Sequence, residues 1–104
     1  MKELLEWIEL QDERLIETHR DATKSERILS RTVKLGEEFG ELCDDVLSAS
    51  KDQRKEKLEK LKEDNLSGEF ADVIITTLLL AKSMDVDIKK ALEKKIEKIN
   101  KRYA

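Results

Sequence analysis

The sequence contains no proline, three glycines and one cysteine, and aromatic residues make up only 4% of it. With so few turn-forming residues, and with Glu, Lys and Leu at most positions, the chain is expected to be helical throughout. The single cysteine, Cys43, excludes an intrachain disulfide and fits a reducing compartment, where we expect it to be a small buried residue. One cysteine and one histidine are also too few to form a zinc site.

Long hydrophobic runs are missing as well. The longest one, VIITTLLLA at residues 73–81, is too short to cross a bilayer as a helix. The N-terminal residues alternate between apolar and charged side chains, which a signal peptide does not do. We therefore expect a cytoplasmic protein with no membrane partner.

The net charge is small, at −3, although 43% of the residues are charged. Residues 85–104 hold seven Lys or Arg against four Asp or Glu, so this segment carries +3 and the first 84 residues carry −6. A domain that binds a nucleic-acid polymer would show a basic face over most of its length. A basic segment beside an acidic site can instead meet phosphate groups.

The 104 residues are expected to form one domain, 1–104, with four helices. The apolar spacing predicts helices over residues 2–20, 25–50 and 67–83, and a fourth that is capped by Asp85 or Asp87. Thr23 and Glu26 have the spacing of a capping box at the start of the second helix. Residues 51–64 contain only two leucines as apolar residues and are interpreted as a solvated connector, with a helical conformation left open. The predicted fold class is all-α.

Acidic residues are concentrated in the second predicted helix. Five of them fall within nine positions: Glu37, Glu38, Glu41, Asp44 and Asp45. Like charges three or four positions apart on a helix repel by about 0.2–0.5 kcal/mol per pair. Taken alone, this acidic side has the pattern of a solvated outer face.

The third predicted helix carries two more acids, Glu69 and Asp72, in a segment that is apolar almost all round and is therefore expected to be buried. Glu69 has a second interpretation, as a first-turn acid favoured by the helix dipole. Asp72 lies too far into the predicted helix for that explanation. Buried carboxylates need to be neutralised, paired with cations or bound to a metal.

If the second and third helices pack antiparallel, the two acidic pairs can face each other. Four carboxylates then suit Mg²⁺ or Mn²⁺, with water completing the coordination. A di-iron carboxylate site would need a Glu-x-x-His pair, which the sequence lacks. The one histidine, His19, is expected to lie at the end of the first helix.

The order Glu37-Glu38-x-x-Glu41 followed by Glu69-x-x-Asp72 resembles the EExxE…ExxD signature of the all-α nucleoside triphosphate pyrophosphohydrolases, the MazG-like superfamily. The resemblance covers roughly residues 25–103, including the Lys-rich last helix. It implies hydrolysis of a nucleoside triphosphate between the α and β phosphates, which gives a monophosphate and pyrophosphate. It also implies a four-helix MazG-like bundle that is completed by oligomerisation, as a homodimer or homotetramer.

Carried over position by position, the resemblance implies that Glu38, Glu41, Glu69 and Asp72 bind Mg²⁺, for which Mn²⁺ is a possible substitute. Glu37 matches the first acid of the signature and is assigned to the outer shell or to positioning the attacking water. The implied catalytic residues are thus Glu37, Glu38 and Glu41.

The resemblance also suggests substrate contacts. Lys95 and Asn100 resemble the C-terminal positions of the family that contact phosphate and nucleotide. Trp7 is the one aromatic residue upstream of the first acids and is either a platform for the base or part of the core. Lys34, with Arg27 and Arg31 before it, either contacts phosphates or belongs to a solvated basic patch.

Other functions remain open at this point. Phosphoribosyl-ATP pyrophosphohydrolase belongs to the same superfamily and would share the acids while acting on another substrate. A non-catalytic helical interaction module would have the acids as solvated faces, and a regulator could keep the fold without catalysis. Stabilisation by Mg²⁺ is expected of the enzyme and not of the interaction module.

Overall fold

The computed structural model describes the backbone of residues 1–51 and 55–104 and the side chains of residues 1–49 and 65–104. This part of the chain forms α-helices and contains no strand, so the predicted all-α fold is confirmed. The helices are α1 (Lys2–Thr18), α2 (Lys24–Lys51), α3 (Lys55–Ser83) and α4 (Ile88–Lys101). Residues 52–54 of the predicted connector lie outside the described residues.

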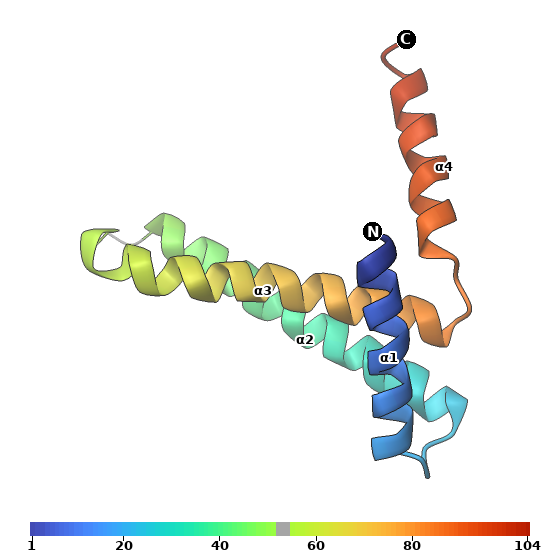
Figure 1. Cartoon of the computed structure of the whole chain (residues 1–104). Helices are drawn as coiled ribbons and strands as arrows, with labels where there is room; N and C mark the ends of the chain where they lie inside the picture. Colours follow the sequence, from blue (N-terminus) through green and yellow to red (C-terminus); the bar gives the residue numbers. More distant parts are fainter. Residues whose placement is uncertain (52–54) are drawn as a thin grey trace.

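The two long helices, α2 and α3, form an antiparallel hairpin (Figure 1). The shorter α1 crosses this hairpin near the start of α2 and the end of α3, and it packs mainly against α3. The last helix, α4, points away from the hairpin (Figure 1). The antiparallel arrangement places the acids of α2 opposite those of α3.

The start of α2 is a capping box, as predicted. The backbone N–H of Thr23 donates to Glu26 Oε1 and the backbone N–H of Glu26 donates to Thr23 Oγ1, both at 3.1 Å. The hydrogen bond from the Thr23 backbone N–H to the Glu26 carboxylate is the largest cause of the lowered pKa of Glu26, and the Thr23 side chain adds to it. The two bonds of the capping box also satisfy two backbone donors that have no partner inside the helix.

The turn between α3 and α4 separates the two aspartates that were candidate caps. Asp87 caps α4, since its Oδ1 accepts from the backbone N–H of Lys90 at 3.1 Å. Asp85 has a left-handed backbone with φ of 56°, and its Oδ2 lies 2.9 Å from Lys24 Nζ at the start of α2. This ion pair ties the turn to the hairpin.

The predicted start of the third helix is wrong. α3 begins at Lys55, and the Ser67-Gly68 pair that was expected to open a helix lies inside it. A glycine within a helix costs only about 1 kcal/mol relative to alanine, and continuous packing against α2 outweighs that cost. Glu69 is therefore well inside α3, which excludes the first-turn explanation for its charge.

The apolar core is small. It consists of the buried Ile8, Leu78 and Leu79, against which five partly buried residues pack: Leu4, Leu5, Leu15, Ile75 and Ile88. The prediction that the third helix is buried all round is wrong for this chain, because Phe70 and Ile74 are 50% and 52% exposed. Within the described residues, α2 and α1 make the main contacts with α3, and they leave the side chains of Phe70 and Ile74 uncovered.

Two further expectations about single residues also need correction. Trp7 is not part of the core, since it is 39% exposed on α1. Cys43 is a free thiol, as expected, but it is only partly buried. Within the described residues, none of the helices is long and apolar enough to cross a membrane.

A buried ion pair holds α1 against the hairpin. Arg31 of α2 donates from Nη1 to Asp12 Oδ1 of α1 at 2.6 Å and to the carbonyl oxygen of Leu79 at 2.9 Å. Both charged residues are 8% exposed. One guanidinium thus joins three helices at the edge of the core.

Candidate metal and phosphate site

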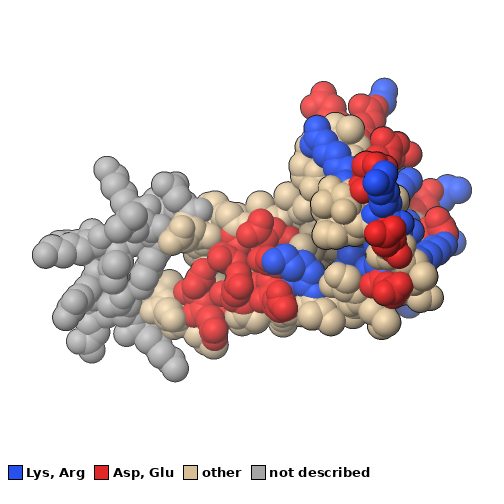
Figure 2. All heavy atoms as spheres, turned by 90° about the horizontal axis from the view of Figure 1, so that it is seen from below, with Lys and Arg blue, Asp and Glu red and all other residues tan. Residues whose placement is uncertain are grey.

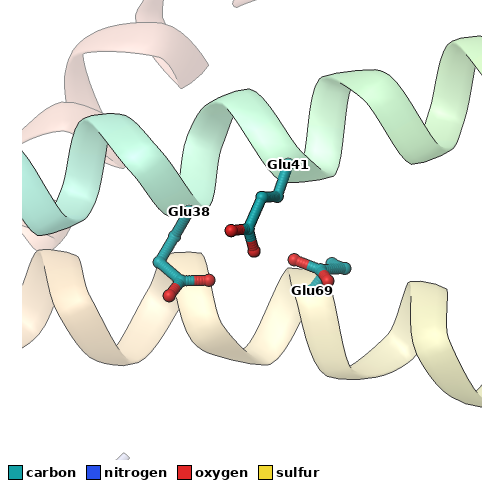
Figure 3. Close-up of side chains that lie close together, drawn as sticks. All are labelled: Glu38, Glu41 and Glu69. Atoms are coloured by element: carbon teal, nitrogen blue, oxygen red, sulfur yellow. The ribbon is translucent and has the colours of Figure 1, made fainter.

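Three glutamates come together between α2 and α3. Glu38 and Glu41 lie one turn apart on α2, Glu69 reaches across from α3, and the three side chains point toward one another (Figure 3). One carboxylate oxygen from each lies within 4.8 Å of the other two. The spacing of three residues on α2 puts both of its acids on one face of the helix.

Two of these carboxylates have a buried oxygen with no donor. Oε2 of Glu38 and Oε2 of Glu69 are both inaccessible to solvent and have no hydrogen-bond partner in the described part of the chain. Buried polar atoms normally have a partner, and a carboxylate without one is costly. The cluster therefore has the electrostatic character of a site for a cation.

The pKa of Glu69 is raised above its ordinary value. Burial is the largest cause, and the negative charges of neighbouring acids add to it, in the order Glu41, Asp45, Glu38 and Asp72. A cation placed among these groups would reverse the effect, because it favours the charged carboxylate. The acids on the facing helices thus act on one another electrostatically.

Lys34 is the cation paired with the cluster among the described residues. Its Nζ lies 3.0 Å from Glu38 Oε1, one turn before it on α2. This hydrogen bond and the charge of Glu38 raise the pKa of Lys34, and the charges of Glu37 and Glu41 add smaller contributions. One ammonium group cannot balance so many carboxylates, so a deficit of positive charge remains.

The donor set fits a hard divalent cation. Three carboxylates from two helices offer only oxygen atoms, which is the ligand type that Mg²⁺ and Mn²⁺ prefer. One unpartnered buried oxygen comes from Glu38 on α2 and one from Glu69 on α3. Glu38, Glu41 and Glu69 are therefore the residues that would hold such an ion.

Asp72 does not join this group. It is exposed, so the expectation that it is buried is wrong; like Phe70 and Ile74, it is not covered by the described helices that pack on α3. Its charge still reaches Glu69 and raises the pKa of that residue. Its role as a fourth ligand remains a prediction. Glu37 is exposed beside the cluster on α2.

A cavity of about 560 Å³ lies next to the acids, between the end of α1, the first half of α2 and the second half of α3. Its polar lining consists of three cations, one acid and three other polar groups: Arg27, Arg31, Lys34, Glu26, His19, Ser30 and Thr76. Lys34 belongs both to this lining and to the pair with Glu38, so the cavity and the acids are contiguous. Figure 2 shows the acids gathered on one face of the hairpin, with Lys or Arg side chains beside them.

The comparison with protein families agrees with this arrangement. A family model described as the MazG nucleotide pyrophosphohydrolase domain matches residues 26–104. The chain belongs to this family. The match includes all three clustered glutamates and Lys34 and ends with α4, while α1 lies outside it. The chain has no significant match among the curated proteins or the solved structures compared with it.

Membership of the MazG family gives the site its chemical context. The family name supports a pyrophosphohydrolase type of activity on a nucleotide, and the family generally uses divalent metals. Of the five acids that carry the resemblance in the sequence, Glu38, Glu41 and Glu69 converge in the structure, while Glu37 and Asp72 do not join the cluster.

The MazG-like signature does not include Arg31, which lines the cavity, or Asp12, which binds Arg31. The sequence pattern suggests Arg31 only as a phosphate contact or a solvated cation. A signal for Asp12 exists in the sequence, because it lies four positions after Ile8 and three before Leu15 on the apolar side of α1. A charge in that stripe indicates a buried partner.

The other expected substrate contacts of the MazG domain lie elsewhere. Lys95 and Asn100 are exposed on α4, which points away from the hairpin that holds the acids (Figure 1). Trp7 is not among the residues that line the cavity. Of the four residues expected to contact the substrate, Lys34 is the one that lies beside the acids of its own chain.

Proposed function

We propose that this chain, as a single MazG domain over residues 1–104, is a Mg²⁺-dependent nucleoside triphosphate pyrophosphohydrolase. It hydrolyses an NTP or dNTP between the α and β phosphates and releases a monophosphate and pyrophosphate. The observation that carries the proposal is the group of three glutamates with two unpartnered buried oxygens beside a cavity lined by cations. We place this activity in the cytoplasm, where it would remove unwanted nucleotides from the pool.

Glu38, Glu41 and Glu69 would hold the Mg²⁺, with Asp72 as the nearest additional carboxylate and Mn²⁺ as a possible substitute. When bound, the ion neutralises charge on the phosphate oxygens and lowers the pKa of bound water. Occupation would also give the buried oxygens of Glu38 and Glu69 the partner that they lack.

The remaining residues divide between the phosphates and the water. Lys34 lies between the acids and the cavity, where its ammonium group can bind the triphosphate. Arg27 and Arg31 line the same cavity and can donate to phosphate or base oxygens. His19 carries the one aromatic ring among the described lining residues, so the base would be bound by polar contacts, with this imidazole as the available stacking surface.

Hydrolysis requires a water molecule aligned with the leaving pyrophosphate. Glu37 is exposed next to Glu38 and can accept the proton of this water as its oxygen bonds to the α-phosphorus. The bond from that phosphorus to the bridging oxygen breaks, and the electron pair leaves with pyrophosphate. Glu37 then acts by proton transfer, while the three clustered acids serve the metal.

Product analysis tests this function. The purified chain is incubated with NTPs, dNTPs and oxidised or deaminated analogues, with Mg²⁺ or with EDTA, and the products are separated by ion-exchange chromatography. We expect monophosphate plus pyrophosphate, lost with EDTA. Diphosphate plus orthophosphate would show that the wrong bond has been assigned. Turnover of phosphoribosyl-ATP alone would keep the reaction and change the substrate, and no turnover at all would favour the interaction module.

A further inference from the structure

The arginine in the wall of the cavity has a donor that the described part of the chain does not use. Arg31 Nη1 donates to Asp12 Oδ1 at 2.6 Å and to the carbonyl oxygen of Leu79 at 2.9 Å. Arg31 Nη2 is buried and has no acceptor among the described residues. The whole residue is 8% exposed, and a buried donor without a partner costs free energy. An acceptor that enters the cavity and reaches Nη2 would relieve this cost.

The two bonds of Nη1 hold the guanidinium in one position. Asp12 belongs to α1 and Leu79 to α3, so the arginine is held from two sides. A guanidinium is planar and stays protonated in proteins, so Nη2 donates at every pH and never accepts. Since Nη2 has no surface open to solvent, a ligand reaches it when a side chain of the lining turns aside. His19 and Ser30 are exposed members of that lining.

Thr76 offers the opposite polarity in the same cavity. It lies three positions before Leu79 on one face of α3, and both residues line the cavity. The hydroxyl of Thr76 donates to the carbonyl oxygen of Asp72 at 2.7 Å, with the carbonyl oxygen of Val73 as a second acceptor at 3.1 Å. A hydroxyl has one proton, so Thr76 Oγ1 can only accept from a ligand. The cavity therefore presents a donor and an acceptor from neighbouring positions.

A donor beside an acceptor is complementary to one class of nucleobase. Uracil, thymine, guanine and hypoxanthine have a carbonyl oxygen next to a ring N–H, which is an acceptor beside a donor. Cytosine and adenine have an amino group next to an unprotonated ring nitrogen, which is the reverse order. An amino group that faced Nη2 would set two donors against each other and leave both unpaired. The cavity, of about 560 Å³, is within the size range of small-molecule pockets.

From this pattern we infer that the base of the substrate enters the cavity and that Arg31 and Thr76 select keto bases over amino bases. Arg31 Nη2 donates to the carbonyl oxygen of the base, and the ring N–H of the base donates to Thr76 Oγ1. The triphosphate then extends toward Lys34, which joins the cavity to the acids. The inference rests on the function proposed above and names its substrate class. Uracil and hypoxanthine are the keto counterparts of cytosine and adenine, so such a site separates deaminated nucleotides from their amino precursors.

Matched pairs of nucleotides test this selection. dUTP differs from dCTP, and dITP from dATP, at the keto or amino group and the protonation of the ring nitrogen beside it. Calorimetry in Mg²⁺ with their α,β-imido analogues, which cannot be cleaved between these phosphates, measures binding without turnover. We expect each keto analogue to bind about tenfold or more tightly than its amino counterpart. Equal binding, tighter binding of the amino analogues, or no binding of any analogue would overturn the inference.

Two substitutions assign the selection to these residues. Thr76→Val keeps the shape of the side chain and removes the acceptor, and Arg31→Lys keeps a charge for Asp12 and removes Nη2. Each should lower the ratio of keto to amino binding about fivefold. Thr77→Val is the control, because Thr77 makes the same kind of bond, to the carbonyl oxygen of Val73 at 2.7 Å, and is not among the described residues that line the cavity. It should keep the parental ratio.

The outcomes for the variants and for hydrolysis separate the two proposals. If Thr76→Val keeps the parental ratio, the selection does not come from this cavity, and this holds even if circular dichroism shows that Arg31→Lys does not fold. A parent that binds keto analogues more tightly but releases no monophosphate would refute the proposed function and keep the inference. A parent that binds both classes equally and cleaves them with the same kcat/KM would keep the function and refute the inference.

Discussion

Arg31 binds Asp12 across 2.6 Å at the junction of three helices, and the same arginine lines the cavity beside the acids. Its second bond, to the carbonyl oxygen of Leu79, fixes the guanidinium against α3. The helix α1, which lies outside the family match, is thereby attached to the α2–α3 hairpin through one buried ion pair.

We expect Asp12→Ala to destabilise the chain by about 3–5 kcal/mol, because it leaves the Arg31 charge buried without its partner. Urea unfolding followed by circular dichroism, at one fixed protein concentration, measures this loss. Glu13→Ala, at the next position and exposed, is the control and should change the free energy of unfolding by no more than about 0.5 kcal/mol. Equal effects of the two substitutions would mean that the pair does not hold α1 in place.

The capping box at the start of α2 gives a second stability prediction. Thr23→Ala removes the hydroxyl that accepts from the backbone N–H of Glu26, and we expect a loss of about 1 kcal/mol. Ser25→Ala is the matched control, since Ser25 is exposed in the same turn and makes no such bond. Both variants can be compared by urea unfolding. A larger loss for Ser25→Ala would show that the cap contributes little.

The sequence was sufficient to predict the four helices and the meeting of the first acids with Glu69. Acids three apart on a helix share a face, and an antiparallel hairpin is the simplest packing of two long neighbours, so Glu38, Glu41 and Glu69 could be placed together in advance. The capping-box spacing of Thr23 and Glu26 likewise predicted the start of α2.

What failed depended on contacts that local patterns do not contain. The segment from Asn65 to Gly68 resembles a helix start, but it lies inside one long helix that begins at Lys55. The apolar sides of α3 gave no information on which side lacks a partner, so the exposure of Asp72 and Phe70 was not foreseen. The apolar stripe on α4, from Leu92 to Ile99, indicated that this side of the helix needs a partner, but it did not indicate where that partner lies.

Binding of Mg²⁺ should stabilise the folded chain through the three glutamates. At a free Mg²⁺ concentration one hundred times Kd, the gain is about 2.7 kcal/mol. Glu41→Gln keeps the size of the side chain and removes one ligand, so we expect its melting temperature to respond to Mg²⁺ far less than that of the parent. Glu13→Gln on α1 should respond like the parent. Calorimetric scans with Mg²⁺ and with EDTA measure both, and an unchanged response of Glu41→Gln would remove Glu41 from the site.

The raised pKa of Glu69 predicts how the metal-free chain responds to pH. The folded chain holds the Glu69 proton more tightly than the unfolded chain, for which the ordinary value is 4.5. As the pH rises through the window just above 4.5, folded molecules therefore bind more protons than unfolded ones, and the free energy of unfolding decreases. Glu69→Gln removes this decrease, so the variant should be more stable than the parent at pH 7 and lose that advantage near pH 4.

Asp85 supplies the opposite case within the same molecule. Its hydrogen bond and ion pair with Lys24 lower its pKa below the ordinary value of 3.8, so its contribution is present above that pH and is lost as the pH falls through the lowered value. Asp85→Asn, which tolerates the left-handed backbone, should be less stable than the parent at pH 7 and equal to it in strong acid. Urea unfolding of both variants without metal, from pH 3 to pH 7, should give differences of opposite sign from the parent. Differences of the same sign at pH 7 would show that burial and the neighbouring acids do not act on Glu69 as the geometry of the hairpin requires.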